Sequence, residues 1–174
     1  MDVADAIRTK RAIRHFAASP LPEEVLLRIL RAGRRAQSSK NTQPWQFIVI
    51  RDPERLRAVS RLGQYADHIA GAAAAVVILT PDPTERWSIL FDAGQAAAYM
   101  QLAAWEQGVG SCLATLYAKD EARALLNFPP DWEAHVALSF GFPAEPDDMS
   151  RAPRSGGRKP PDELFQYEEW GRRA

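Results

Sequence analysis

The strongest constraint on the fold comes from a polar segment that runs directly into an apolar one. Residues 37–44 are all polar or proline, and residues 47–50 read Phe-Ile-Val-Ile. This β-branched run predicts a buried strand, and apolar residues spaced by three and four over 22–36 predict a helix before it. A loop held between two rigid elements and rich in hydrogen-bonding groups is suited to binding a polar ligand. An ordinary polar turn is the alternative.

A basic segment near the amino terminus is a second candidate for ligand contact. Residues 10–16 read Lys-Arg-Ala-Ile-Arg-His-Phe. In an extended backbone Lys10, Ala12 and Arg14 point to one side. Grouped cations suit a phosphate, because its oxygens accept charge-assisted hydrogen bonds. A solvated surface segment is the alternative reading.

Composition narrows the function classes. The chain has 174 residues, 46% of them hydrophobic and 25% charged, which fits one globular domain over 1–174. Its formal net charge is zero, which argues against a dedicated nucleic-acid-binding protein. The one cysteine, Cys112, excludes an intrachain disulfide and a multi-cysteine zinc site, and its apolar neighbours predict an unreactive, buried thiol.

Export and membrane insertion are not expected. The longest apolar run, residues 69–79, is well short of the roughly 18 residues that span a bilayer. The first seven residues, Met-Asp-Val-Ala-Asp-Ala-Ile, lack the basic and apolar regions of a signal peptide. We therefore expect a cytoplasmic protein that contacts no membrane.

The order of apolar patterns predicts an α+β fold with a central mixed, largely antiparallel sheet flanked by helices. Helices are expected over 2–9, 22–36, 53–59 and 119–126, and strands over 46–51, 73–80, 111–115 and 134–142. A long Ala-rich helix is expected from the capping-box spacing at 82–85 to about residue 107. Its apolar residues go nearly all round, which predicts burial on most sides, as in the middle of an oligomer.

The carboxy-terminal residues 143–174 predict an extended arm. Residues 143–161 combine prolines with many charges, and the last turn carries Phe165, Tyr167 and Trp170. Such a segment has too little apolar surface to fold alone, yet is too aromatic to remain free in solution. We expect it to dock on a second subunit.

Standard catalytic arrangements are absent from the sequence. The three histidines lack metal-ligand spacing, there is no Gly-x-Ser-x-Gly or Walker motif, and 108–110 lacks the third glycine of a dinucleotide fingerprint. We predict no metal site and no catalytic acid, base or nucleophile. Donors and cations without such groups are typical of a protein whose bound cofactor carries the reaction.

These segments together resemble the nitroreductase family of flavin enzymes. The resemblance rests on residues 10–16, the loop 36–45, the Ala-rich helix that leads to 108–112, and Arg158-Lys159-Pro160, in the family's order over nearly the whole chain. It implies a short member of the family, an intertwined homodimer with FMN at the interface. It also implies an enzyme that uses NAD(P)H to reduce nitroaromatics, quinones or similar acceptors in a ping-pong cycle.

The resemblance also assigns cofactor contacts. Residues of one subunit would contact the phosphate, the ribityl chain, the pyrimidine edge and the side of the flavin ring. The second subunit would present a loop to the same flavin. The first group is Lys10, Arg11, Ala12, Arg14, Leu113, Ala114, Thr115 and Arg158; the loop group is Gln37, Ser38, Ser39 and Asn41, and Arg35 matches a contact of some short members.

Three features depart from the family pattern. Ala12 stands where a hydroxyl residue is usual, which removes one hydrogen bond of roughly 1 kcal/mol. Gly156 stands where some members carry a second basic residue, and Lys159 is a candidate substitute. Residues 81–91 leave no room for the helices that cover the active site in longer members, so we expect an open substrate cavity.

Other functions remain open at this point. The same scaffold serves flavin-fragmenting and dehalogenating members, and a flavin-binding carrier or sensor without reductase activity is also compatible with the motifs. A nucleic-acid-binding module would use the basic stretches 8–14 and 151–159. The neutral overall charge argues against that module.

Overall fold

The central sheet has four strands in the order β1-β2-β4-β3, and each neighbouring pair is antiparallel. The computed structural model describes residues 1–150 and 157–172. The strands are β1 (Gln46–Ile50), β2 (Ala74–Pro81), β3 (Gly110–Thr115) and β4 (Trp132–Gly141). The predicted α+β class and largely antiparallel sheet are confirmed. Within the described residues, parallel pairing is confined to the isolated bridge between Ala12 and Ser111.

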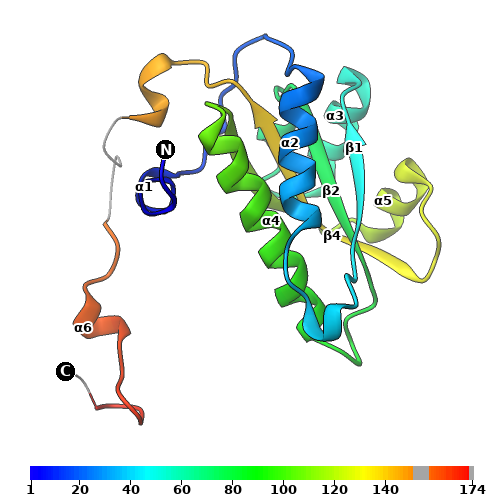
Figure 1. Ribbon diagram of the computed structural model, residues 1–174. Helices are drawn as coiled ribbons and strands as arrows, with labels where there is room; N and C mark the ends of the chain where they lie inside the picture. Colours follow the sequence, from blue (N-terminus) through cyan, green and yellow to red (C-terminus); the bar gives the residue numbers. More distant parts are fainter. Residues whose placement is uncertain (151–156, 173–174) are drawn as a thin grey trace.

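Helices cover both faces of the sheet. The helices α2 (Glu23–Arg34) and α4 (Ser88–Glu106) pack together on one face, and α3 (Pro53–Val59) and α5 (Lys119–Leu126) lie on the other (Figure 1). Because side chains alternate along a strand, each face of β4 serves its own core. Leu138 and Phe140 belong to the core under α2 and α4, and Ala137 belongs to the core under α3 and α5.

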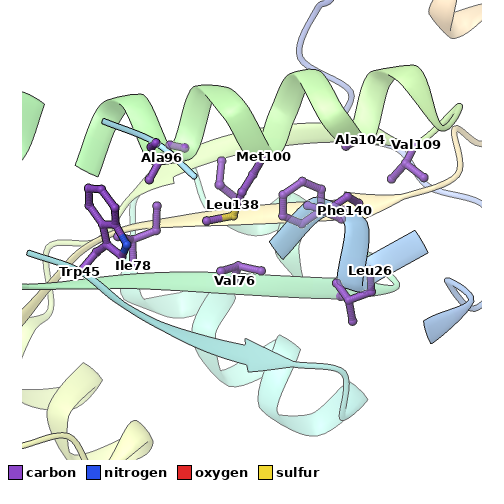
Figure 2. Close-up of a cluster of buried hydrophobic side chains, with 14 of the residues drawn as sticks. Leu26, Trp45, Val76, Ile78, Ala96, Met100, Ala104, Val109, Leu138 and Phe140 are labelled. Atoms are coloured by element: carbon purple, nitrogen blue, oxygen red, sulfur yellow. The ribbon is translucent and has the colours of Figure 1, made fainter. Parts of the chain in front are cut away.

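The core under α4 is closely packed. Met100 lies over the sheet beside Leu138 and Phe140 (Figure 2). A Cβ atom added to Gly33 of α2 would lie 2.4 Å from Cε of Met100. A larger residue at position 33 would require the Met100 side chain to move, so glycine favours this close approach of α2 to α4.

The start of α4 differs from the prediction. The helix begins at Ser88, whereas the capping-box spacing predicted a start at 82–85. The backbone N–H and the hydroxyl of Thr84 both donate to Oδ1 of Asp82, at 2.9 and 2.6 Å. This local turn uses the side-chain oxygen that would have capped a helix, which explains why the prediction was wrong.

One side of α4 stays uncovered in the single chain. Eight of its residues are buried, including Ala96 and Trp105. In contrast, Leu90, Phe91 and Tyr99 are 43%, 65% and 39% exposed. Large apolar side chains gathered on one helix are typical of an interaction surface.

The amino-terminal segment runs along the outer edge of the sheet. The helix α1 (Val3–Thr9) ends beside the last turns of α4, where Nε1–H of Trp105 donates to Oγ1 of Thr9 at 2.9 Å. The chain then passes β3, and the backbone N–H of Ile13 donates to the carbonyl of Ser111 at 3.0 Å. A Cβ on Gly110 would lie 2.7 Å from Cβ of Ile13, so glycine permits this approach.

The described part of the arm, residues 157–172, lies apart from the sheet and the helices that cover it (Figure 1). The last turn of the chain was expected over 163–170. The helix α6 (Pro161–Leu164) ends near the start of that range, before the aromatic residues. Phe165, Tyr167 and Trp170 are 56%, 51% and 93% exposed. Gly156 lies outside the described residues, as does Arg151. Whether the arm docks on a second subunit stays a prediction.

Candidate functional site

Cations from both ends of the chain gather beside β3. Burial, and then the positive charge of Arg158, lowers the pKa of Lys10. Burial raises the pKa of Cys112, although the nearby charges of Arg14 and Lys10 oppose that shift. Lys10 and Arg14 therefore lie near Cys112 of β3, and Arg158 lies near Lys10; that these cations hold a ligand stays a prediction.

Arg11 is held by its own segment and keeps a free donor. Its Nε–H donates to the carbonyl of Thr9 at 3.1 Å. Its Nη1 is buried and has no hydrogen-bond partner within residues 1–150 and 157–172. A buried donor without an acceptor costs about 1–3 kcal/mol of folding free energy. A ligand oxygen that accepts a hydrogen bond from Nη1 would recover part of that cost. Ala12, by contrast, offers its backbone to β3 through the bridge with Ser111.

The outer edge of β3 presents two of its three predicted contacts. Leu113 and Thr115 are exposed, whereas Ala114 is 3% exposed and belongs to the core under α3 and α5. The side chain of Ala114 therefore cannot reach a ligand, which leaves its backbone groups. Past the bridge at Ala12, no strand among the described residues pairs with this edge.

The polar loop has an unusual backbone. Three of its non-glycine residues, Lys40, Asn41 and Gln43, have φ of 53°, 53° and 48°. This left-handed region is uncommon for residues with a Cβ, and such residues concentrate at ligand-binding sites. The hydroxyl oxygen of Ser38 accepts the backbone N–H of Gln43 at 2.8 Å and closes the loop.

Two charged residues near the start of α4 fix the loop. The backbone N–H of Ser39 donates to both carboxylate oxygens of Asp92, at 3.1 and 3.2 Å. Arg86 donates to the carbonyl of Ser39 at 3.2 Å and to the hydroxyl of Thr42 at 2.8 Å, and lies 3.8 Å from Asp92. Asp92 is only 4% exposed. The loop is therefore built in one conformation, with Gln37 and Asn41 exposed on it.

The predicted contacts form two groups at opposite ends of α4. The loop joins α4 at Asp92, and the cationic segment joins it at Trp105. These residues are thirteen positions apart in the helix, which at 1.5 Å per residue is about 20 Å. Arg35, which is exposed at the end of α2, lies on the loop side. One chain therefore does not bring the loop and the cations together.

A pocket of about 540 Å³ opens beside Arg14. Gln64, Tyr65 and His68, from the connection between α3 and β2, line it. His68 is 8% exposed, and its Nδ1 lies 2.8 Å from Oγ of Ser139. Burial and the charge of Arg14 lower the pKa of His68, so its imidazole is neutral at pH 7.

Sequence reasoning missed Asp92, Arg86 and His68. A signal for Asp92 existed, since it is a charge inside an Ala-rich, largely apolar helix whose other charge, Glu106, is its last residue. Arg86 and His68 gave no comparable signal, because their partners lie far away in the sequence. Of the other histidines, His15 lines the same pocket, and Nε2 of His135 lies 3.0 Å from a carboxylate oxygen of Glu133 on β4.

Residues 1–150 and 157–172 contain neither a metal site nor a membrane-spanning helix. They contain no group of three or more His, Cys, Asp or Glu side chains arranged to hold a metal ion. No helix among them has both the length and the apolar character needed to cross a membrane.

Comparison with known proteins identifies the family. Residues 7–75 and 58–142 match the family described as "Nitroreductase family". The chain is 31% identical over 173 residues to the "Putative NADH dehydrogenase/NAD(P)H nitroreductase" of Archaeoglobus fulgidus, which covers 94% of this chain and 96% of the relative.

Solved structures share the fold over the whole chain. The "FMN-dependent Nitroreductase" of Clostridium difficile R20291 superposes with a TM-score of 0.84 at 25% identity, covering 97% of this chain and 100% of its own. A nitroreductase from Desulfovibrio desulfuricans, solved in complex with FMN, gives a TM-score of 0.80 at 27% identity and covers 98% of each chain. Sequence and structure agree along the chain, which therefore belongs to the nitroreductase family.

Proposed function

We propose that this protein binds FMN and uses NAD(P)H to reduce small organic acceptors such as nitroaromatics and quinones. The observation that carries the proposal is a set of neighbouring cations beside β3: Lys10 and Arg14 lie near Cys112, and Arg158 lies near Lys10. A phosphate group is matched by two or three cations, and the free Nη1 of Arg11 offers it a further donor. The residues present therefore fit a phosphorylated cofactor.

The site would be completed by a second copy of the chain. The loop with Ser39 and Asn41 lies about 20 Å along α4 from the cations, so a compact site that uses both needs two subunits. The uncovered side chains of α4, with Phe91 the most exposed, supply an apolar surface for the contact. We infer a homodimer with two equivalent flavin sites at its interface.

The roles of the chain's own residues follow from their chemistry. FMN, when bound, supplies the hydride chemistry that links NAD(P)H to the acceptor in two half-reactions. Lys10 and Arg158 would hold the phosphate. Arg14 would stabilise negative charge that develops on the pyrimidine ring, as a fixed cation in a partly buried site does. The backbone at Leu113 and Thr115 would position the ring against β3.

We expect the acceptor side of the site to be open. Only residues 82–87 join β2 to α4, and they form turns without an inserted helix. A site without a covering helix makes few contacts with any one acceptor, so we propose a broad range of acceptors. Relatives named for NADH or NAD(P)H support the choice of electron donor.

We propose that residues 1–174 act as one domain, with the arm as its carboxy-terminal part. Residues 1–150 hold both cores of the sheet, and the exposed Phe165, Tyr167 and Trp170 give the arm apolar anchors. We propose that the arm wraps the partner subunit and that Arg158 reaches the phosphate site on the way.

The visible spectrum of the purified protein tests the cofactor. Flavin absorbance, with FMN and not FAD released on denaturation, is the expected result. Steady-state oxidation of NADH and NADPH with a quinone or a nitroaromatic then separates a reductase from a flavin carrier. Colourless protein that takes up no added FMN would refute the proposal, and a yellow protein that turns over no acceptor would favour the carrier.

A further inference from the structure

His68 presents a buried hydrogen-bond acceptor that the protein leaves unsatisfied. The hydroxyl of Ser139 donates to the carbonyl of Cys112 at 3.3 Å, which uses its one hydrogen. The 2.8 Å contact between Oγ of Ser139 and Nδ1 of His68 is then a second hydrogen bond only if Nδ1 donates. In this tautomer Nε2 carries a lone pair. Nε2 is buried and has no hydrogen-bond partner within the described ranges.

The position of the acceptor is fixed by the fold. Ser139 and Cys112 face each other across the β4–β3 ladder, and Ser139 holds one nitrogen of the ring. His68 cannot turn without losing that hydrogen bond, so Nε2 keeps one direction. An unmet buried acceptor is destabilising, and a donor from outside the protein would relieve that cost.

The pocket beside His68 gives a donor a way to reach it. His68 and Arg14 both line the 540 Å³ pocket, together with Tyr65, which is 75% exposed. Side-chain rotamer changes are common on ligand binding, so movement of a lining side chain would open Nε2 to the pocket. The pocket thus offers a cation that donates hydrogen bonds next to a neutral acceptor.

This pair matches a ligand with a carbonyl oxygen next to an N–H group. The pyrimidine ring of a flavin has this edge, with the C2 carbonyl beside N3–H. A nicotinamide carboxamide has the same chemistry. The flavin is favoured because Arg14 follows directly on the segment that gathers the phosphate-binding cations, and the ring of the same ligand would lie along β3.

We propose that His68 positions the flavin, with Nε2 accepting the N3–H of the pyrimidine ring while Arg14 donates to the C2 carbonyl. This proposal rests on the proposed function. N3–H is present in both the oxidised and the reduced ring, so His68 contributes to affinity and orientation in both. Arg14 acts on the charge of the reduced ring and therefore also sets the reduction potential.

Titration of the apo protein with FMN and with 3-methyl-FMN tests the assignment. Methylation removes the N3–H donor, so the wild-type protein should bind 3-methyl-FMN at least about tenfold more weakly than FMN. His68→Ala should bind FMN about tenfold more weakly, yet distinguish the two flavins less than about twofold, because the acceptor is lost and space for the methyl group is gained. His68→Gln, which keeps an acceptor, should retain most of the preference.

His135→Ala is the matched control, since His135 is also partly buried but pairs with Glu133 away from the pocket. It should show the wild-type preference. If His68 were only structural, His68→Ala would weaken both flavins equally and keep their ratio, which would overturn the proposal. The reduction potential should move in Arg14→Ala and stay close to wild type in His68→Ala.

Two further outcomes would also overturn it, and the first needs no variant. Equal affinity of the wild-type protein for both flavins would exclude an acceptor at N3–H while leaving the proposed function intact. An unchanged flavin preference in His68→Ala with a raised KM for NADH would assign the pocket to the carboxamide instead. A protein that binds no flavin at all would refute the proposed function as well.

Discussion

The backbone N–H of Ser39 is held by both carboxylate oxygens of Asp92, 53 residues later in the chain. Asp92 lies in α4 and is almost fully buried, and Arg86 lies 3.8 Å away as its counter-charge. This contact ties the conformation of a surface loop to the helix that we expect at the dimer centre. Loop geometry and subunit contact are therefore connected through one side chain.

Replacing Asp92 with Ala should lower the free energy of unfolding by about 1–3 kcal/mol, because the N–H of Ser39 loses its acceptor and Arg86 loses its counter-charge. FMN affinity should fall as well, since the loop loses its anchor. Asp92→Asn keeps one acceptor oxygen and should cost less. Urea unfolding and FMN titration measure both effects. Asp120→Asn is the control: its side chain is 97% exposed, and the change should stay within about 0.5 kcal/mol.

Removing the cations should weaken FMN binding without unfolding the protein. Arg14→Ala and Arg158→Ala should each cost about 1–3 kcal/mol of binding free energy, the range for a lost charge-assisted hydrogen bond. Titration of the apo protein measures this cost. Arg8→Ala removes a cation that pairs with Asp5 and is 72% exposed, and it should bind FMN as the wild type does. Equal affinities in all three variants would show that Arg14 and Arg158 are surface charges.

Truncation after Asp148 should lower FMN content and dimer stability together. The removed segment includes Arg158 and the exposed Phe165, Tyr167 and Trp170. If FMN binds only the assembled dimer, loss of the arm weakens both through linkage. Light scattering after size exclusion, combined with flavin absorbance, measures both. A truncated protein that remains a fully flavinated dimer would assign the arm no role in assembly.

Acid should destabilise the fold through two histidines. Burial lowers the pKa of both His68 and His135 below the value of about 6.5 expected in the unfolded chain. As the pH falls below about 6.5, the unfolded chain therefore takes up protons that the folded chain resists, and the free energy of unfolding decreases. Urea unfolding at several pH values between about 7.5 and 5.5 should show this decrease. It should be smaller in the double variant His68→Gln/His135→Gln, and an unchanged slope there would contradict the assignment.

Cys112 should resist alkylation in the folded protein. Its thiol is 2% exposed, and burial raises its pKa, so little thiolate forms at neutral pH. Iodoacetamide should modify it only at the rate of unfolding, which mass spectrometry with and without denaturant measures. Fast labelling of the native protein would instead show that the charges of Arg14 and Lys10 lower the pKa of the thiol more than burial raises it.

The elements of the fold could be predicted because their signals are local. The apolar run at 47–50 and the spacing of apolar residues in 22–36 each specify one element, and β1 and α2 lie where these patterns placed them. The start of α4 was the exception, because an Asp82–Thr84 turn competes for the same side chain that would cap a helix. Predictions of this kind fail where one local sequence pattern is compatible with two different structures.

The contacts of the site could be predicted only in part. The cationic segment and the loop carry motifs, so their residues could be named from the sequence. The partners that fix them could not: Ser39 meets Asp92 across 53 residues, and His68 meets Ser139 across 71. The left-handed backbone at Lys40 and Gln43 has no sequence signal either, because neither residue is glycine or a common substitute for it.

The placement of the two half-sites at opposite ends of α4 has a genetic consequence. In a homodimer of this design each flavin takes its cations from one subunit and its loop from the other. Consider a dimer of one chain that carries Arg14→Ala and Arg158→Ala and one chain that carries Asp92→Ala. One flavin site then combines the altered cations of the first chain with the altered loop of the second. The other site combines the wild-type cations of the second chain with the wild-type loop of the first. Two alleles that are each inactive alone would then complement one another in the same cell.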